Sequence, residues 1–117
     1  LTGAVMVTTP QELALLDVKK GADMFAKVNT PVLGVIENMT HYLCPHCNVK
    51  SRIFPGSGGA EESKRLEVPL LGQIYLSPEL AESADEGNPY VLKNNNSPIT
   101  QEFHKIADYL VNLAETL

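Results

Sequence analysis

The stretch GAVMVTTPQELALLDVKKGADMFAKVNTPVLGVI, residues 3–36, decides the fold. Its first residues, 3–8, form an apolar, β-branched run without alternation, which is typical of a strand buried on both faces of a parallel sheet. A second run of this kind, 32–36, follows Pro31. A helical hairpin is disfavoured because Pro31 and Gly34 would then lie inside a helix. Two such strands with a helix between them, within about 35 residues, predict a right-handed βαβ unit.

The segment between these strands has the marks of a helix. Thr9 is a suitable cap, Pro10 fits the first helical position, and Glu12 completes a capping box. The helix is expected to run to about Lys27. Its apolar stripe is predicted to contain Ala14, Val18, Ala22 and Phe25.

Further elements follow a long irregular segment, 37–59. Loops of that length are usually functional or disordered. A helix is expected to start at the Gly58–Ala60 segment and to end near Leu66, and a short strand over 70–74. Ser77 is then predicted to cap another helix, with Pro78 in its first turn.

The last part of the chain is predicted to be a polar surface loop, 85–97, and a final helix that begins at Ser97 and Pro98. The apolar stripe of this helix is expected to contain Ile99, Phe103, Ile106, Leu110 and Leu113. The order of elements predicts an α/β fold of three layers with a mostly parallel sheet, in which residues 1–117 form part of a single domain. We expect an upstream segment to supply further strands at one edge of the sheet.

Composition excludes several classes of protein. The 117 residues are 44% hydrophobic and carry a net charge of -5, with no basic cluster, which argues against a nucleic-acid-binding protein. Apolar runs are far shorter than the ~20 residues of a membrane helix. The first residues lack a basic leader, so we expect no secretion signal. With only two cysteines, a reducing, cytoplasmic compartment is expected.

Both cysteines lie in HYLCPHCNVKS, residues 41–51. Cys44 and Cys47 have the spacing of a thiol oxidoreductase or of half a metal site. A redox thiol needs a helix N-terminus to lower its pKa, but Pro55 and Gly56 end the segment that follows. The oxidoreductase interpretation is therefore disfavoured, and a turn without chemistry stays a further alternative.

A metal site requires more ligands than this pair supplies. A closed structural zinc site has about four ligands, and neither His41 nor His46 is well placed to complete one. Two copies around a two-fold axis would bring four thiolates together, the ligand set of a [4Fe–4S] cluster. A zinc-stabilised interaction module without catalysis is the alternative.

Four motifs of the chain resemble one family, and the resemblance extends in order over essentially the whole chain. They are VTTPQELALLDVKKGADMF (7–25), TPVLGVIENMTHYLCPHC (30–47), IFPGSGGAEE (53–62) and VPLLGQIYLSPELAESADEGNPYV (68–91). These motifs are similar to the C-terminal half of the Mrp-type iron–sulfur cluster carrier ATPases, in the MinD/ParA branch of the P-loop NTPases.

The resemblance implies a homodimer that binds ATP and Mg²⁺, bridges a [4Fe–4S] cluster and transfers it to apo iron–sulfur proteins. It implies that Cys44 and Cys47 are cluster ligands. It also implies that Asn38 lies near the adenine and that the turn containing Pro78 and Glu79 lies against the base.

The chain departs from this family in one respect. It contains no Walker A loop, switch Asp or Walker B strand, and the glycine-rich 56–59 lacks the Gly-Lys-Ser/Thr end that cradles phosphates. The full-length protein is expected to be an ATPase. This chain is not expected to hydrolyse ATP alone, and no catalytic residue is assigned within it.

Overall fold

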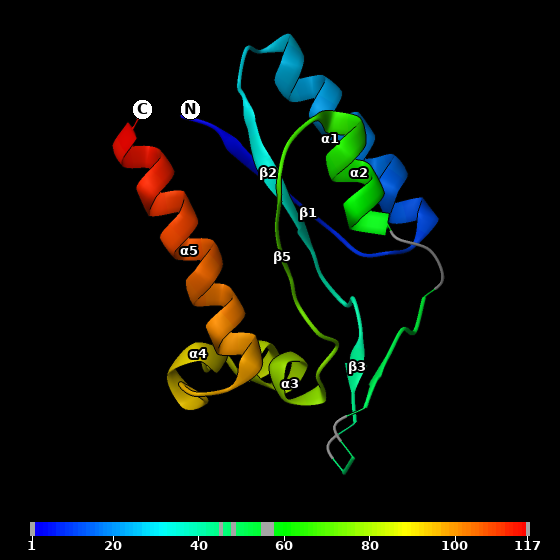
Figure 1. The fold of residues 1–117 in the computed structure, drawn as a ribbon, viewed down its shortest axis with the longest axis vertical. Coiled ribbons are helices and arrows are strands. Elements are labelled where there is room, and N and C mark those ends of the chain that lie inside the picture. The colour runs from blue at the N-terminus through cyan, green and yellow to red at the C-terminus, as the bar shows by residue number, and fades with distance from the viewer. Residues whose placement is uncertain (1, 45, 48, 55–57, 117) are drawn as a thin grey trace.

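The computed structural model describes residues 2–44, 46–47, 49–54 and 58–116 (Figure 1). The elements are, in chain order, β1 (Ala4–Thr8), α1 (Glu12–Lys27), β2 (Val32–Glu37), β3 (Tyr42–Leu43), β4 (Lys50–Ser51), α2 (Gly58–Leu66), β5 (Leu70–Gln73), α3 (Pro78–Glu86), α4 (Tyr90–Lys93) and α5 (Pro98–Thr116).

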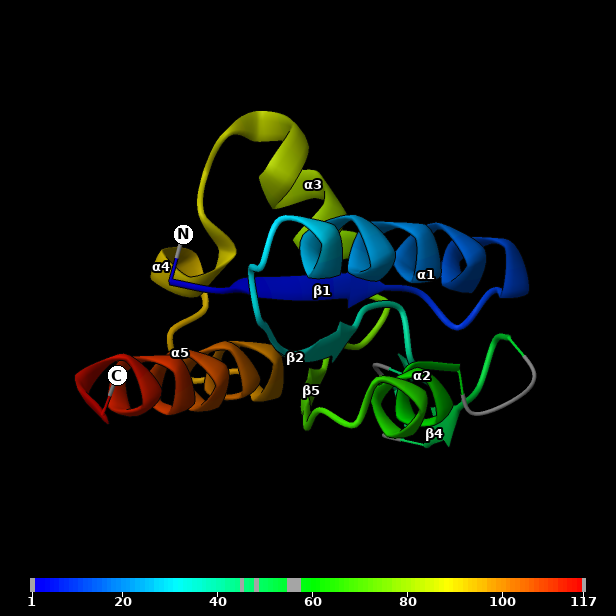
Figure 2. The same ribbon diagram turned by 90° about the horizontal axis from the view of Figure 1, so that it is seen from above.

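The central sheet has the order β1-β2-β5, and both pairings are parallel. Helices α1 and α2 cover one face and α5 covers the other, with the sheet between them (Figures 1 and 2). The predicted α/β fold of three layers with a parallel sheet is therefore confirmed. Because parallel strands end at the same edge, the residues after β1, β2 and β5 are brought together.

Helix α1 begins later than the cap prediction placed it. Its N-cap is Gln11, which makes no side-chain cap hydrogen bond, and the predicted cap Thr9 donates instead to Oε1 of Gln11 at 3.0 Å. The prediction of Thr9 as the cap and Pro10 as the first helical residue is therefore wrong. The predicted end at Lys27 is confirmed.

The core beneath α5 is built by side chains from β5, α4 and α5. Its buried members are Leu71, Ile74, Tyr90, Ile99 and Ile106, with Phe103 and Leu110 packed against them. A Cβ at Gly72 would lie 2.5 Å from Cδ1 of Ile106, so a glycine there lets α5 approach the sheet. The predicted apolar stripe of the last helix is the face that packs on β5.

Both serine caps predicted in the second half of the chain are present. Oγ of Ser77 accepts from the Leu80 N–H at 3.3 Å, and Oγ of Ser97 accepts from the Thr100 N–H at 3.1 Å. The predicted loop over 85–97 is only partly correct. Helix α3 continues to Glu86, and the short α4 interrupts the remainder because buried Tyr90 anchors it to the core.

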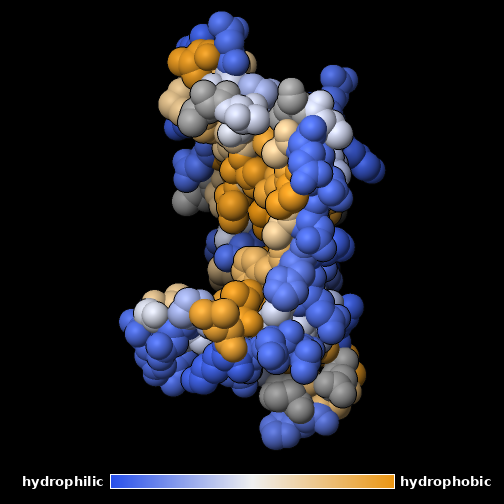
Figure 3. All heavy atoms as spheres, turned by 90° about the vertical axis from the view of Figure 1, so that its left-hand side faces the viewer, coloured by the Kyte–Doolittle hydropathy of each residue, from blue (hydrophilic) through white to orange (hydrophobic). Residues whose placement is uncertain are grey.

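Strand β1 forms an edge of the described sheet, and its face beside α5 is only partly covered. Val7 is 60% exposed, although the sequence predicted a strand buried on both faces. Apolar side chains gather on the side of the molecule that α5 leaves open (Figure 3). Among the described helices, none is long and apolar enough to cross a membrane.

Candidate functional site

The two cysteines lie in the connection of a small hairpin that projects from the carboxyl edge of the sheet (Figure 1). Strands β3 and β4 pair antiparallel, and the Cys44 N–H donates to the Val49 carbonyl at 3.1 Å. Both thiols are free, with Cys44 half-buried and Cys47 exposed. Pro45 and Asn48 fall outside the described residues. The thiols are therefore accessible from solvent rather than enclosed.

Local hydrogen bonds favour the thiolate form of Cys44. The backbone of Cys47, then the backbone of His46 and the Cys47 thiol, lower the pKa of Cys44, while slight desolvation opposes them. The thiolate is the form that binds metal ions. The hairpin therefore lowers the pKa of Cys44 through local hydrogen bonds, without the help of a helix N-terminus.

A third ligand is not gathered around the thiols. Within the described ranges no group of three or more His, Cys, Asp or Glu side chains could hold a metal ion. The ring of His41 packs edge-on against Tyr75, with centroids 6.0 Å apart. Burial, followed by the charges of Arg52 and Lys50, lowers the pKa of His41.

The base of the segment that holds the cysteines is fixed by a buried carboxylate. Glu37, the last residue of β2, has no exposed surface. Its Oε1 accepts from Thr40 Oγ1 at 2.7 Å, and its Oε2 accepts from the Gly59 N–H at 2.5 Å. A Cβ at Gly59 would lie 2.7 Å from Cβ of Glu37. This contact joins the two ends of the long segment, and it places a carboxylate at the N-terminus of α2.

The carboxylate also limits what the N-terminus of α2 can bind. A helix N-terminus attracts anions through its free N–H groups and its dipole. At the N-terminus of α2 the anion position is taken by the carboxylate of Glu37. A phosphate at the N-terminus of α2 would meet this carboxylate, so phosphate binding is disfavoured there.

The segment from β2 to the hairpin lies alongside the end of β5. The Ile74 N–H donates to the Glu37 carbonyl at 2.8 Å, the Thr40 N–H to Ile74 at 3.0 Å, and the Leu76 N–H to His41 at 2.7 Å. Tyr42 and Leu76 form a parallel bridge. The chain leading into the cysteine hairpin and the chain leading into the Ser77–Pro78 turn are therefore one hydrogen-bonded unit.

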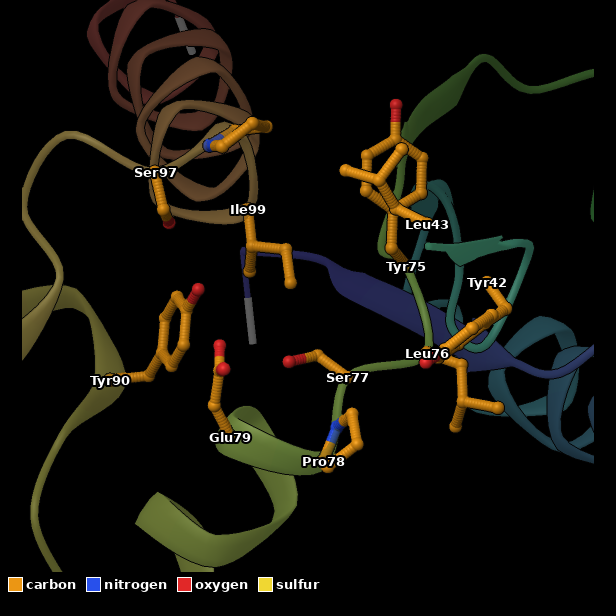
Figure 4. Close-up of a pocket in the computed structure, with 11 residues that line it drawn as sticks. Tyr42, Leu43, Tyr75, Leu76, Ser77, Pro78, Glu79, Tyr90, Ser97 and Ile99 are labelled. Carbon is orange, nitrogen blue, oxygen red and sulfur yellow. The ribbon is translucent and has the colours of Figure 1, made fainter. Parts of the chain in front are cut away.

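Pro78 and Glu79 line a cavity of about 270 Å³ between the hairpin, the start of α3, α4 and the start of α5. The hydroxyl groups of Tyr90 and Ser77 and the carboxylate of Glu79 point toward the same space (Figure 4). Apolar side chains form much of the remaining wall. The volume is just below the ~300–1,000 Å³ of whole-ligand pockets, which suits one part of a ligand.

Asn38 lies elsewhere. It lines a separate hollow with residues of β1 and α1, including Thr9 and Asp17. Its Oδ1 accepts from the Met39 N–H at 2.9 Å, where Met39 has a positive φ of 57°. The structure therefore places the three residues that were predicted near the base in two separate hollows.

Sequence reasoning missed Glu37 and Tyr90. An acidic residue at the end of an apolar strand is a visible signal for the first, since a charge beside a buried strand needs a reason. No local signal identified the second, because a long polar stretch surrounds Tyr90.

The chain has the fold of the MinD-type P-loop ATPases. It superposes on the septum site-determining protein MinD complexed with Mg-ADP from Pyrococcus horikoshii with a TM-score of 0.72, at 28% identity, covering 97% of this chain and 42% of that one. A nucleotide-binding protein in complex with ADP from Archaeoglobus fulgidus is similar over 74% of this chain and 35% of its own length, with 32% identity and a TM-score of 0.64.

Residues 1–111 match the ParA family of NUBPL iron-transfer P-loop NTPases, and the chain belongs to this family. An iron–sulfur cluster carrier protein of Aquifex aeolicus is 46% identical over 116 residues. That match covers 99% of this chain and 32% of the relative. The resemblance to iron–sulfur carrier ATPases of the MinD/ParA branch is confirmed, and the chain spans about a third of the length of this relative.

Proposed function

We propose that this protein carries a [4Fe–4S] cluster, held between the Cys44–Cys47 pairs of two copies, and delivers it to apo iron–sulfur proteins. The observation that carries the proposal is the hairpin itself. It holds two free thiols at metal-binding spacing, one of them exposed, without a third ligand among the described residues. The name of the Aquifex aeolicus relative supports the same cargo.

A two-fold assembly completes the ligand set. A [4Fe–4S] cluster takes four thiolates, and each hairpin supplies two. The pair lies on a projecting connection, so two hairpins can meet without displacing the core. A cluster at such a junction is accessible from solvent, which allows its transfer. The lowered pKa of Cys44 favours the ligand form of one thiol in each copy.

We further propose that ATP binds at the carboxyl edge of the sheet, with its base against the turn of Pro78 and Glu79. The carboxylate of Glu79 accepts a hydrogen bond from the 6-amino group of adenine. Guanine carries a carbonyl oxygen at that position and has no donor there. Asn38 contacts the nucleotide from the separate hollow that it lines with residues of β1 and α1. Phosphates and Mg²⁺ bind mainly to residues outside this chain. Any residue that performs hydrolysis also lies outside it.

Nucleotide and cluster are coupled through the paired segments that end in His41 and Leu76. A shift of the turn on nucleotide binding moves Leu76, and the hydrogen bond to His41 passes the shift to the hairpin. The carrier acts in a reducing compartment, the cytoplasm, where free thiols persist.

Anaerobic reconstitution of the full-length protein with iron and sulfide tests the proposal. We expect a brown dimer with broad visible absorbance and about four irons per dimer. A colourless protein with stoichiometric zinc would support the zinc-stabilised module instead. Turnover of a dithiol substrate would support a thiol oxidoreductase.

A further inference from the structure

The cysteine hairpin differs in charge from the rest of the molecule. The chain carries 9 basic and 14 acidic residues, yet no Asp or Glu occurs between Glu37 and Glu61. That interval contains Lys50 and Arg52. The most acidic chain segments therefore lie elsewhere, and the hairpin is a local basic projection.

Lys50 is the first residue of β4, the strand that follows the cysteines, and Arg52 comes directly after that strand. Lys50 pairs with Leu43, the residue before Cys44. Its Nζ lies 5.2 Å from the centroid of the Tyr75 ring, which orients the ammonium group while the residue stays exposed. Arg52 is also exposed. The charge of Lys50 is thus held at a defined position across from the residue that precedes Cys44.

Neither cation is neutralised within the described part of the chain. The ion pairs found there join Arg65 to Glu62 and Lys105 to Glu102. Val49 is 57% exposed and Ile53 is 48% exposed on the same segment. Exposed apolar side chains thus lie on both sides of the two cations, and exposed apolar residues beside an arginine are features of a protein-binding surface.

The geometry points to a docking surface, made of Val49, Lys50, Arg52 and Ile53, for a recipient protein whose cluster-accepting cysteines lie in an acidic surface. This inference rests on the proposed carrier function. A recipient must present thiolates to accept iron, so its site is already negative before neighbouring carboxylates are counted. Lys50 and Arg52 attract such a site and place it beside Cys44 and Cys47.

Other anionic partners fit less well. Binding of nucleic acid requires the neutralisation of several phosphates, and the hairpin offers two unpaired cations on a protein of net charge -5. A second copy of this chain presents the same positive charges and would be repelled unless an anionic cluster lay between the two hairpins. The surface beside the thiols is therefore complementary to an acidic protein.

The test compares two charge-reversal variants of the full-length protein. The test variant is Lys50→Glu with Arg52→Glu, and the matched control is Lys27→Glu with Lys93→Glu, at exposed positions of α1 and α4. Each double substitution changes the net charge of the chain by four, from -5 to -9. Cluster content is measured by visible absorbance before transfer is started.

Two acceptors are used, an acidic apo [4Fe–4S] protein and a version whose carboxylates around the cysteines are changed to amides. We expect the test variant to load its cluster normally. Its rate of transfer to the acidic acceptor should fall to about one tenth of the original rate or lower, while the control keeps the original rate. Added salt should slow the unmodified protein toward the test variant. Equal rates for the two variants, or transfer that does not depend on salt, would overturn the docking surface.

Two further measurements separate this inference from the carrier function. The affinity of the apo-protein for the acidic apo-acceptor is measured by fluorescence anisotropy, which needs no cluster. Loss of this affinity in the test variant supports the surface even if no cluster forms. If the test variant loses binding to anionic vesicles but binds the acceptor as well as the unmodified protein does, Lys50 and Arg52 serve membrane binding. That result would contradict the inference.

Discussion

The Leu76 N–H donates to the His41 carbonyl at 2.7 Å, and this bond joins two functional segments. Leu76 precedes the turn of Ser77 and Pro78, and His41 precedes the strand that leads to Cys44. The nearby bridge between Tyr42 and Leu76 extends the same contact. A backbone connection of this kind transmits displacement more faithfully than contacts between mobile side chains.

Removal of this bond tests the coupling. Leu76→Pro deletes the N–H group, whereas Leu76→Ala keeps it and truncates the same side chain. We expect the proline variant to lose about 1–3 kcal/mol of stability, because the His41 carbonyl loses its donor. In the full-length protein it should also lose the effect of ATP on cluster release. Retention of that effect in the proline variant, measured by visible absorbance with and without ATP, would separate the two sites.

Replacement of either cysteine tests the ligand assignment. Cys44→Ser and Cys47→Ser each leave one thiol per chain, so a dimer retains two of the four ligands that a [4Fe–4S] cluster takes. We expect the visible absorbance and the cluster-dependent dimer to be lost, as measured by spectroscopy and analytical ultracentrifugation. Ser51→Ala, on the paired strand β4, is the control and should bind as the original does. A cluster that persists in both serine variants would remove these thiols from the ligand set.

Glu37 is expected to be the largest single contributor to the stability of the cysteine segment. Glu37→Ala leaves the buried Gly59 N–H without its acceptor and the Thr40 hydroxyl with only the longer bond to the carbonyl of residue 37, at a cost of about 1–3 kcal/mol. Glu37→Gln keeps an oxygen for one of them and should cost less. Urea denaturation followed by circular dichroism measures both. Equal stability of the alanine variant and the original would show that the carboxylate is replaceable by water.

Glu79→Gln tests the base-binding turn. The amide can still accept through its oxygen but loses the charge, and its nitrogen can donate to the O6 of guanine. We therefore expect weaker ATP binding and a smaller preference for ATP over GTP, by about tenfold in the ratio of dissociation constants, measured by calorimetry on the full-length protein. Glu82→Gln, on the exposed side of the same helix, is the control. An unchanged ratio would move the base away from Glu79.

His41 makes stability depend on pH. Burial and the charges of Arg52 and Lys50 lower its pKa in the folded protein below 6.5, so the unfolded chain binds a proton first as pH falls. The stability that the neutral imidazole of His41 contributes is complete above the unfolded pKa of 6.5. It is lost as pH falls below that pKa and through the lower pKa of the folded protein. The free energy of unfolding should drop between about pH 7.5 and 5.5, and His41→Phe should reduce the drop. An identical pH profile for this variant would contradict the prediction.

The sequence by itself determined the elements whose signals are local. Apolar runs without alternation identified β1 and β2, and a serine followed by a proline identified the starts of α3 and α5. In each case the residues that carry the signal lie within one or two turns of the backbone they order. The spacing of Cys44 and Cys47 predicted half a metal site or a redox pair within a long irregular segment, and the metal assignment stays a prediction.

Only the tertiary structure decided how these pieces form a site. Glu37 meets Gly59 across 22 positions and Gln73 across 36, and no local pattern encodes either contact. The same holds for the cavity that Tyr90 shares with Glu79 and for the separation of Asn38 from that cavity. Such contacts arise because parallel strands end at one edge of the sheet, and which side chains meet there depends on strand order and register. The overestimated burial of Val7 has the same cause, since a strand pattern records what a residue can bury but not which neighbour covers it.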